Sequence, residues 1–401
     1  MKRIQHGLVL AAVAFVAALA LPATNAAAAT ALSQTPSSTY QTNDRVSAIL
    51  TVGNMTIIGG RFTSVRPPGA PAGVGEVQRQ HIAAFDATTG DLLPWNPGAD
   101  GEVKALAVTL DGTAVDIGGK FRTVDGAKRR NAAQIDLSTG DVTSWAPLVG
   151  GMVETILPTP DGTLIGGAFT TVSGTTHPNL VRVDDAGAVD PTWTTSTDAR
   201  VRVLALTPDG TKLLVGGEFS TVNGVNGQRR LEALSPDTGA ILDWQIRPGY
   251  PVYSLAFGDS VIFVGGNGSG GHAAAFDAAS GDHIWTIQTD GGVQAVVLVG
   301  GVLVAGGHFN NVCLGVYDGA TSGFHCPQNQ AVRKKLVALD PITGVVDPWN
   351  PSADSALGVW SLGTIGDSLL VGGDFDKIGS PSSESTPTFR QQGFARFDLS
   401  G

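Results

Sequence analysis

The chain has 401 residues, of which 25 are Lys or Arg and 35 are Asp or Glu, so its formal net charge is −10. A chain this acidic lacks the basic surplus that displaces counterions from nucleic acids, and anionic membrane surfaces are disfavoured for the same reason. Charged residues make up only 15% of the sequence, while Gly contributes 54 residues and Pro 22. This composition is typical of short strands joined by tight turns, and it excludes helical bundles and disordered tails.

The N-terminus has the pattern of a secretory signal peptide. Lys2 and Arg3 precede an apolar run over residues 8–21, and small residues follow up to Ala29. The apolar run is shorter than the roughly 20 residues that span a bilayer. We therefore expect residues 1–29 to be a signal peptide cleaved within residues 26–29. The mature chain then holds 23 basic against 35 acidic residues and is secreted or part of the cell envelope, with no membrane span.

A Gly-Gly doublet recurs seven times along the rest of the chain. The doublets lie at 59–60, 118–119, 166–167, 216–217, 265–266, 306–307 and 372–373. All but the fifth are followed, one residue on, by Phe and then, three residues later, by Val or Ile. Self-similarity at about 50 residues indicates a repeat architecture.

Each repeat predicts four short strands. An alternating stretch such as residues 103–107 leads to a tight turn such as Asp111-Gly112, and a second strand then runs into the Gly pair. A third strand resembles residues 82–86, where Asp86 begins a turn, and a fourth ends in Trp. The six Trp residues at matching places are Trp95, Trp145, Trp193, Trp244, Trp285 and Trp349. Four strands in about 50 residues are typical of a propeller blade.

The two ends of the chain complement each other. The last repeat stops after its third strand at residues 394–398, whereas residues 39–44 before the first repeat look like a stray fourth strand with Tyr40 at the Trp position. We therefore predict an all-β fold: a seven-bladed β-propeller of four-stranded blades over residues 30–401. The N-terminal strand would complete the last blade and close the ring, which removes both free edges.

The motifs resemble a known repeat family. Gly-Gly-x-Phe-x-x-Val, Ala-x-x-Asp-x-x-Thr-Gly and Trp-Asn-Pro (residues 95–97 and 349–351) are similar to the delta-60 type repeats of secreted bacterial β-propellers and of fungal cortical cell-polarity markers. The resemblance covers the whole mature chain. It implies a propeller and an extracellular or cell-envelope location, and it brings no assigned activity or catalytic residue.

Two columns of the repeat differ in every copy, and such breaks in a pattern are candidates for function. The second residue of the first strand is Ser47, Lys104, Glu154, Arg202, Tyr253, Gln294 and Trp360 in turn. The residue after the Gly pair is Arg61, Lys120, Ala168, Glu218, Asn267, His308 and Asp374. Hairpin pairing places the two columns side by side at one mouth of the channel. A solvated rim is the alternative interpretation.

The last three repeats carry the candidate ligand site. It consists of Tyr253, Asn267, Gln294, His308, Trp360 and Asp374. Aromatic faces beside amide and carboxylate groups suit a carbohydrate or another polar polymer. The sixth repeat also has an insertion holding Tyr317, Phe324 and His325. In an exported protein its two cysteines, Cys313 and Cys326, most simply form a disulfide.

The sequence favours a binding or adhesion scaffold that recognises an extracellular glycan, a cell-wall polymer or a protein on its loop face. It carries no nucleophile elbow, phosphate-binding loop or zinc-protease motif, and we expect no cofactor and no metal. An extracellular polysaccharide hydrolase or lyase, drawing its carboxylates from Glu154, Glu218 or Asp374, is one alternative. A quinoprotein-like dehydrogenase is the other, because residues 275–285 resemble the docking motif of those propellers.

Overall fold

The computed structural model describes residues 32–227, 230–244, 246–315, 326, 330–381 and 386–400. The signal peptide expected over residues 1–29 lies outside these ranges. The described residues form strands, turns and bends and no helix, so the all-β prediction is confirmed. Within them no helix is present that is long and apolar enough to cross a membrane.

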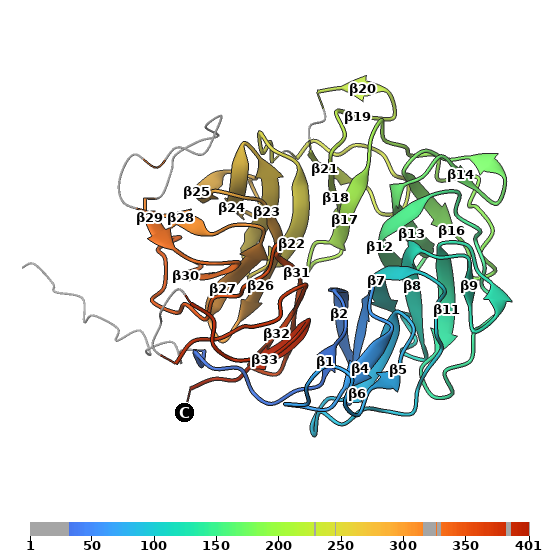
Figure 1. Cartoon of the computed structure of the whole chain (residues 1–401). Helices are drawn as coiled ribbons and strands as arrows, with labels where there is room; N and C mark the ends of the chain where they lie inside the picture. The colour runs from blue at the N-terminus through green and yellow to red at the C-terminus, as the bar shows by residue number, and fades with distance from the viewer. Residues whose placement is uncertain are drawn as a thin grey trace, which may run out of the picture.

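Seven antiparallel sheets share one strand order, and their first strands lie nearest the middle of the molecule (Figure 1). The first strands are β2 (Val46–Val52), β7 (Glu102–Val108), β12 (Met152–Thr159), β17 (Val201–Leu206), β22 (Val252–Phe257), β26 (Val293–Val299) and β31 (Val359–Ile365). The second strands are β3 (Met55–Gly60), β8 (Ala114–Lys120), β13 (Gly162–Ala168), β18 (Leu213–Gly217), β23 (Val261–Gly268), β27 (Val302–Gly307) and β32 (Ser368–Gly373). The third strands are β6 (Ile82–Asp86), β11 (Ala132–Asp136), β16 (Leu180–Val183), β21 (Leu231–Leu234), β24 (Gly270–Asp277), β30 (Leu336–Leu339) and β33 (Phe394–Phe397).

Shorter strands connect these sheets at their rims. They are β1 (Gln41–Thr42), β4 (Ser64–Arg66), β5 (Val77–Gln78), β9 (Thr123–Val124), β10 (Ala127–Lys128), β14 (Thr171–Val172), β15 (Thr175–Thr176), β19 (Thr221–Val222), β20 (Val225–Asn226), β28 (Asn311–Cys313) and β29 (Gln330–Val332). Most are small hairpins between a second and a third strand. Their Val residues pair with the loop that leads from the preceding sheet into their own sheet, as Val124 pairs with Ala99.

Among the described residues, the expected fourth strand is fully formed in only one of the seven sheets. There β25 (His283–Thr289) pairs with β24 from Gly271 to Phe276. Elsewhere the segment before the Trp makes a single bridge to the third strand, as Leu92 does to Phe85. Pro94, Pro191 and Pro348 lie in three of these segments, and because proline lacks an N–H it cannot continue a ladder. The sequence therefore predicted the position of this strand correctly and its length wrongly.

Turn chemistry matches the sequence. The carboxylate of Asp86 accepts hydrogen bonds from the backbone N–H groups of Thr88 at 2.9 Å and Thr89 at 2.8 Å. The same turn recurs after Asp136, Asp277 and Asp340. These acidic side chains are occupied by local structure, as an Asx turn requires.

The first Gly of each doublet lets neighbouring sheets approach closely. A Cβ atom added to Gly118 would lie 2.4 Å from Cγ1 of Val153 in the next sheet. The same contact joins Gly59 to Val103, Gly166 to Val201, Gly216 to Val252, Gly265 to Val293, Gly306 to Val359 and Gly372 to Val46. The space left by the absent side chain on one sheet is therefore filled by a buried Val of the next sheet, which explains why the doublet recurs.

The six recurring Trp side chains are buried between adjacent sheets. Trp95 packs in one core cluster with Ile117 and Ile135 of the following sheet. Five of the indole N–H groups donate to a backbone oxygen beyond their own sheet: Trp95 to Asp136, Trp145 to Asp184, Trp244 to Ala279, Trp285 to Pro341 and Trp349 to Ser33. Burial combined with a satisfied N–H makes each indole a specific link between neighbours.

The N-terminal segment lies beside β33. Leu32 bridges to Leu399 and Ser37 to Arg396. The N–H of Ser37 donates to the oxygen of Arg396 at 2.8 Å, as the N–H of Leu93 donates to Ala84 at 2.9 Å two residues before Trp95. By this register Thr39, rather than the expected Tyr40, takes the place of the Trp.

Candidate functional site

All seven residues of the first variable column lie at β-bulges. Each first strand shifts register across one residue, between Val46 and Ala48 for example, so that the intervening residue has no partner on the second strand. The bulged residues are Ser47, Lys104, Glu154, Arg202, Tyr253, Gln294 and Trp360. A bulge re-aims the side chain it carries.

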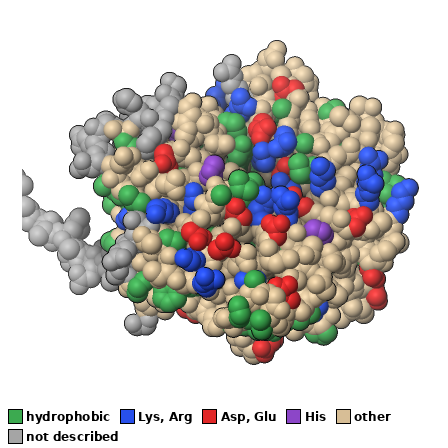
Figure 2. Space-filling model, viewed as in Figure 1, with side chains coloured by type: hydrophobic (Ala, Val, Ile, Leu, Met, Phe, Trp, Pro, Cys, Tyr) green, Lys and Arg blue, Asp and Glu red, His purple; other side chains and the backbone are tan. Residues whose placement is uncertain are grey.

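These seven side chains line one central cavity of about 320 Å³. They come from seven different sheets, and residues one or two positions further along the same strands complete the wall. Figure 2 shows Lys and Arg side chains beside Asp and Glu side chains near the middle of the face in view. The expected convergence of the first column is therefore present.

One part of the wall is charged. Lys104 Nζ lies 2.8 Å from Glu154 Oε2, and the Glu154 side chain is only 5% exposed. Arg45 pairs with Glu102, which also accepts a hydrogen bond from Ser47 at 3.0 Å. Burial raises the pKa of Glu102, but the hydrogen bond and charge of Arg45 outweigh that effect, so the pKa lies below its usual value.

Arg202 links this charged part to the aromatic part. Its guanidinium donates to Glu218 Oε1 at 2.6 Å and lies 3.6 Å from Glu154. Burial lowers the pKa of Arg202, but the two carboxylates outweigh it and hold that pKa above its ordinary value. The same guanidinium lies 4.5 Å from the centre of the Tyr253 ring. This contact is a cation–π interaction that fixes the ring.

The other part of the wall is neutral, with Tyr253, Gln294 and Trp360 half-buried around the cavity. Asn267 Nδ2 donates to the Tyr253 hydroxyl at 3.4 Å, so in this sheet the two columns touch as the sequence predicts. The guanidinium of Arg45 lies 4.2 Å from the Trp360 ring centre. The buried Trp360 Nε1 has no hydrogen-bond partner within the described ranges.

Three of the candidate residues, Asn267, His308 and Asp374, lie outside the wall of this cavity. Asp374 accepts hydrogen bonds from the backbone of Leu357 at 3.0 Å and Gly358 at 2.9 Å, and from the hydroxyl of Ser355. Its carboxylate thus fastens the loop that enters β31. His308 is exposed, and its backbone N–H donates to Gly292 at 2.7 Å.

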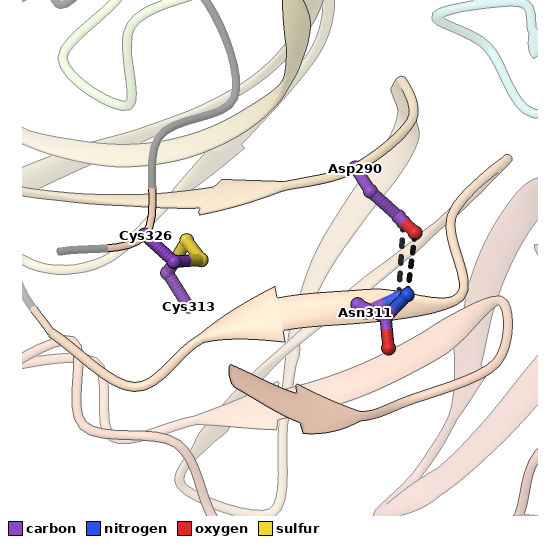
Figure 3. The surroundings of a disulfide bond; sticks show 4 residues. All are labelled: Asp290, Asn311, Cys313 and Cys326. Atoms are coloured by element: carbon purple, nitrogen blue, oxygen red, sulfur yellow. Dashed lines mark hydrogen bonds between the residues drawn. A yellow bond between two sulfur atoms is a disulfide. The ribbon is translucent and has the colours of Figure 1, made fainter. Parts of the chain in front are cut away.

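The predicted disulfide between Cys313 and Cys326 is present. Cys313 ends β28, a strand that Asp290 fastens from the neighbouring loop (Figure 3). The carboxylate of Asp290 accepts hydrogen bonds from the backbone N–H of Asn311 at 2.9 Å and from its side-chain amide at 2.7 Å. Tyr317, Phe324 and His325, which the sequence places in the same insertion, lie outside the described residues.

Sequence reasoning missed three charged residues that contact the wall of the site: Arg45, Glu102 and Arg200. Each stands two positions before a residue of the first column, and alternate residues of a strand share a face. Arg200 lies 3.8 Å from Glu154 and 3.9 Å from Glu218. Comparing the repeats at the position two residues before the first column would have identified these side chains in the sequence.

The carboxylates that a hydrolase would draw on are all held by other groups of the protein. Glu154 and Glu218 are engaged by arginines, and Asp374 by backbone N–H groups. None of the three carboxylates offered to a hydrolase is free of such partners. In the described part of the chain, no group of three or more His, Cys, Asp or Glu side chains is arranged to hold a metal ion.

Comparison with known proteins defines the class of fold. A family model with the description "Domain of unknown function (DUF5122) beta-propeller" matches residues 159–192. The crystal structure of the WD40 beta propeller domain of Doa1 superposes with a TM-score of 0.51 at 12% identity, covering 90% of this chain and 97% of that one. The chain therefore has a β-propeller fold.

A second solved structure superposes to a similar extent. The computationally designed Ika8 protein superposes with a TM-score of 0.52 at 12% identity, covering 90% of this chain and 98% of that one. A search of curated proteins returns no match. Likeness at this identity concerns the fold alone, so function is argued from the site. The likeness to delta-60 type repeats remains a prediction.

Proposed function

We propose that the chain is a secreted, seven-bladed β-propeller that binds an extracellular polymer at the mouth of its central cavity. The observation that carries this proposal is the convergence of seven dissimilar bulged side chains on one cavity, within a chain whose other recurring positions repeat. A scaffold requirement would keep these positions alike, whereas a ligand of mixed chemistry requires that they differ.

A closed ring is part of the proposal. In its support, β2 packs against β31 as it packs against β7. Gly372 faces Val46 as each earlier Gly faces the Val of the next sheet. The bridges of Leu32 and Ser37 to the β33 segment supply the outer strand that the last sheet lacks. Such a ring leaves no sheet edge open for pairing with another chain.

The proposed ligand is a carbohydrate or a similar hydroxyl-rich polymer of the cell envelope. Trp360 and Tyr253 offer aromatic surface, Gln294 and Asn267 offer amides, and the charged wall offers Lys104 and Arg202. Stacking on C–H faces combined with a few fixed polar groups is how proteins bind sugars. The arginines over the two rings hold them in place before binding, which lowers the entropic cost of recognition.

The test uses the mature chain, residues 30–401, against a glycan panel and purified cell-wall fractions. The Trp360→Ala/Tyr253→Ala variant is expected to lose binding at least tenfold. Phe389→Ala, which removes an aromatic side chain that is 37% exposed outside the cavity, is the matched control and should bind normally. Circular dichroism verifies that all three proteins are folded. Undiminished binding by the double variant would contradict the proposed site.

The secretion part of the proposal has its own test. Expression of the full chain with its first 29 residues should yield an extracellular protein that begins within residues 26–30. The Cys313–Cys326 disulfide supports export, because such bonds persist in oxidising compartments. Retention of the uncleaved chain inside the cell would contradict this part.

A further inference from the structure

The interface between the β31–β32–β33 sheet and the β2–β3–β6 sheet contains a cavity of about 270 Å³. We call it the seam pocket; it is lined by Ser37–Tyr40, Thr56, Phe85–Gly90, Ile365, Leu370, Phe394, Arg396 and Asp398. At the six other interfaces between successive sheets, this region holds the indole of a recurring Trp. Here the backbone register brings the much smaller Thr39 to that position.

The glycines at matching turns of the sheets show where an aromatic ring is absent. A Cβ atom on Gly140 would lie 3.3 Å from the Trp95 ring, and one on Gly344 would lie 2.7 Å from the Trp285 ring. Gly239 faces the Trp193 ring in the same way, at 2.9 Å. Gly90, which occupies this turn position at the seam, has no atom within 4 Å. The seam pocket therefore has open space where three sister sites have an aromatic ring.

The hydrogen-bond acceptor of the sister sites is also available. The carbonyl of Asp136 accepts from the N–H of Gly140 at 2.9 Å and from Trp95 Nε1 at 3.0 Å. The carbonyl of Asp86 accepts from the N–H of Gly90 at 2.8 Å. Among the described residues, no side chain supplies the second bond. A carbonyl oxygen has two lone pairs, so Asp86 retains an acceptor pointing into this region.

The walls suit a flat ring. Phe85 and Phe394 are stacked with their centroids 5.9 Å apart, and Tyr40 tilts over Phe85 at 5.4 Å. Arg396 and Asp398 are paired with each other at 2.6 Å, so their charges are already balanced. Exposed residues at Ser38, Thr88 and Thr89 form the rim, which gives a ligand access from solvent. An apolar cavity of about 150 Å³ already accepts benzene, so the seam pocket has room for a bicyclic ring.

We propose that the seam pocket binds a free, planar aromatic heterocycle with one N–H donor, of the indole type. The ring lies in the pocket against Tyr40, Phe85 and the turn at Gly90, and its N–H donates to the carbonyl of Asp86. The ligand thus reproduces from solution the contact that the chain makes for itself at Trp95. This site lies at the turn end of the sheets and is separate from the central cavity.

The test is titration calorimetry of the mature chain with indole, and with 1-methylindole and indene as matched rings without the N–H donor. Indole should bind one site, and both analogues should bind at least fivefold more weakly. Equal affinity for all three would overturn the role of the Asp86 carbonyl. Absence of heat and of saturation-transfer NMR signals up to the solubility limit of indole would overturn the site.

Two variants locate the binding. Thr39→Trp fills the seam pocket from within, and Tyr40→Trp does so from the adjacent position if the first fails to fold. Either folded variant should melt at a higher temperature than the wild type and lose indole binding at least tenfold. Trp360→Ala, in the central cavity, should bind indole normally. Indole binding that survives the filled pocket, or that disappears in Trp360→Ala, would overturn the assignment.

Discussion

Replacing Gly372 with Ala tests whether the first and last sheets pack against each other. The added Cβ atom would lie 2.7 Å from Cγ1 of Val46 and 2.3 Å from the Ser361 hydroxyl. The Ser361 hydroxyl can rotate away, but the β-branched Val46 is confined to few rotamers and is fully buried. The clash with Val46 therefore decides the outcome.

The expected cost follows from two opposing effects. Overpacking a closely packed interior costs about 1–3 kcal/mol. Replacing a strand Gly with Ala returns about 0.5–1 kcal/mol, because the unfolded chain loses freedom. We expect a net loss of about 1–2 kcal/mol in the free energy of unfolding. Urea denaturation followed by tryptophan fluorescence, with m-values compared between variants, measures it.

Two further variants make the result specific. Gly118→Ala produces the same clash with Val153 between sheets that are consecutive in the chain. Gly98→Ala meets only Gln80 at 3.5 Å, so it should stay within about 0.5 kcal/mol of the wild type. Combining Gly372→Ala with Val46→Ala should recover about 1 kcal/mol relative to the sum of the single changes. The reasoning is refuted if Gly118→Ala destabilises the protein while Gly372→Ala does not.

Three other outcomes are expected. Burial raises the pKa of Asp116 to about 6, above its unfolded value, so its contribution to stability is present below about pH 4 and is lost as the pH rises through 6. The free energy of unfolding of Asp116→Asn, measured in urea, should therefore exceed that of the wild type by about 3 kcal/mol at pH 8 and equal it at pH 4. Equal unfolding curves at pH 8 would contradict this expectation. Glu154→Gln leaves Lys104 without its buried counter-charge and Arg202 with Glu218 alone, and it should cost about 3 kcal/mol in the same assay. A neutral effect would show that the pair of Lys104 and Glu154 is solvent-screened. The disulfide between Cys313 and Cys326 closes a loop with a sequence separation of 13, so its reduction should lower the free energy of unfolding by about 3 kcal/mol. An unchanged urea midpoint in the presence of reductant would count against a structural role.

Most of the fold could be predicted from the sequence repeat, because each recurring residue has one local structural role. The Gly doublets, the turn acids and the Trp residues were recognisable in the sequence. In the structure the doublets let neighbouring sheets approach closely, the acids form Asx turns, and the Trp side chains make contacts between sheets. The fourth strands were overestimated; in three of them proline interrupts the ladder without altering the hydrophobic pattern, and the single bridges before Trp145 and Trp244 have no such cause in the sequence. Tyr40 was matched to the Trp position by residue type, although the hydrogen-bond register brings Thr39 there.

The candidate site was predictable in part. Positions that vary within a constant pattern identified Lys104, Tyr253 and Trp360, which do line one cavity. The β-bulge that aims them inward follows from strand pairing and has no sequence mark of its own. The loop contacts of Asp374 could not be predicted, because a carboxylate that fastens a loop is indistinguishable, in sequence, from one that serves a ligand. Its partners are backbone N–H groups.

An experimental structure of the mature chain tests the closed ring most directly. We predict seven sheets around one axis, with residues 32–40 running beside β33 of the same molecule and Val46 against Gly372. A different number of sheets, or an N-terminal segment paired with the β33 of a second molecule, would contradict the account.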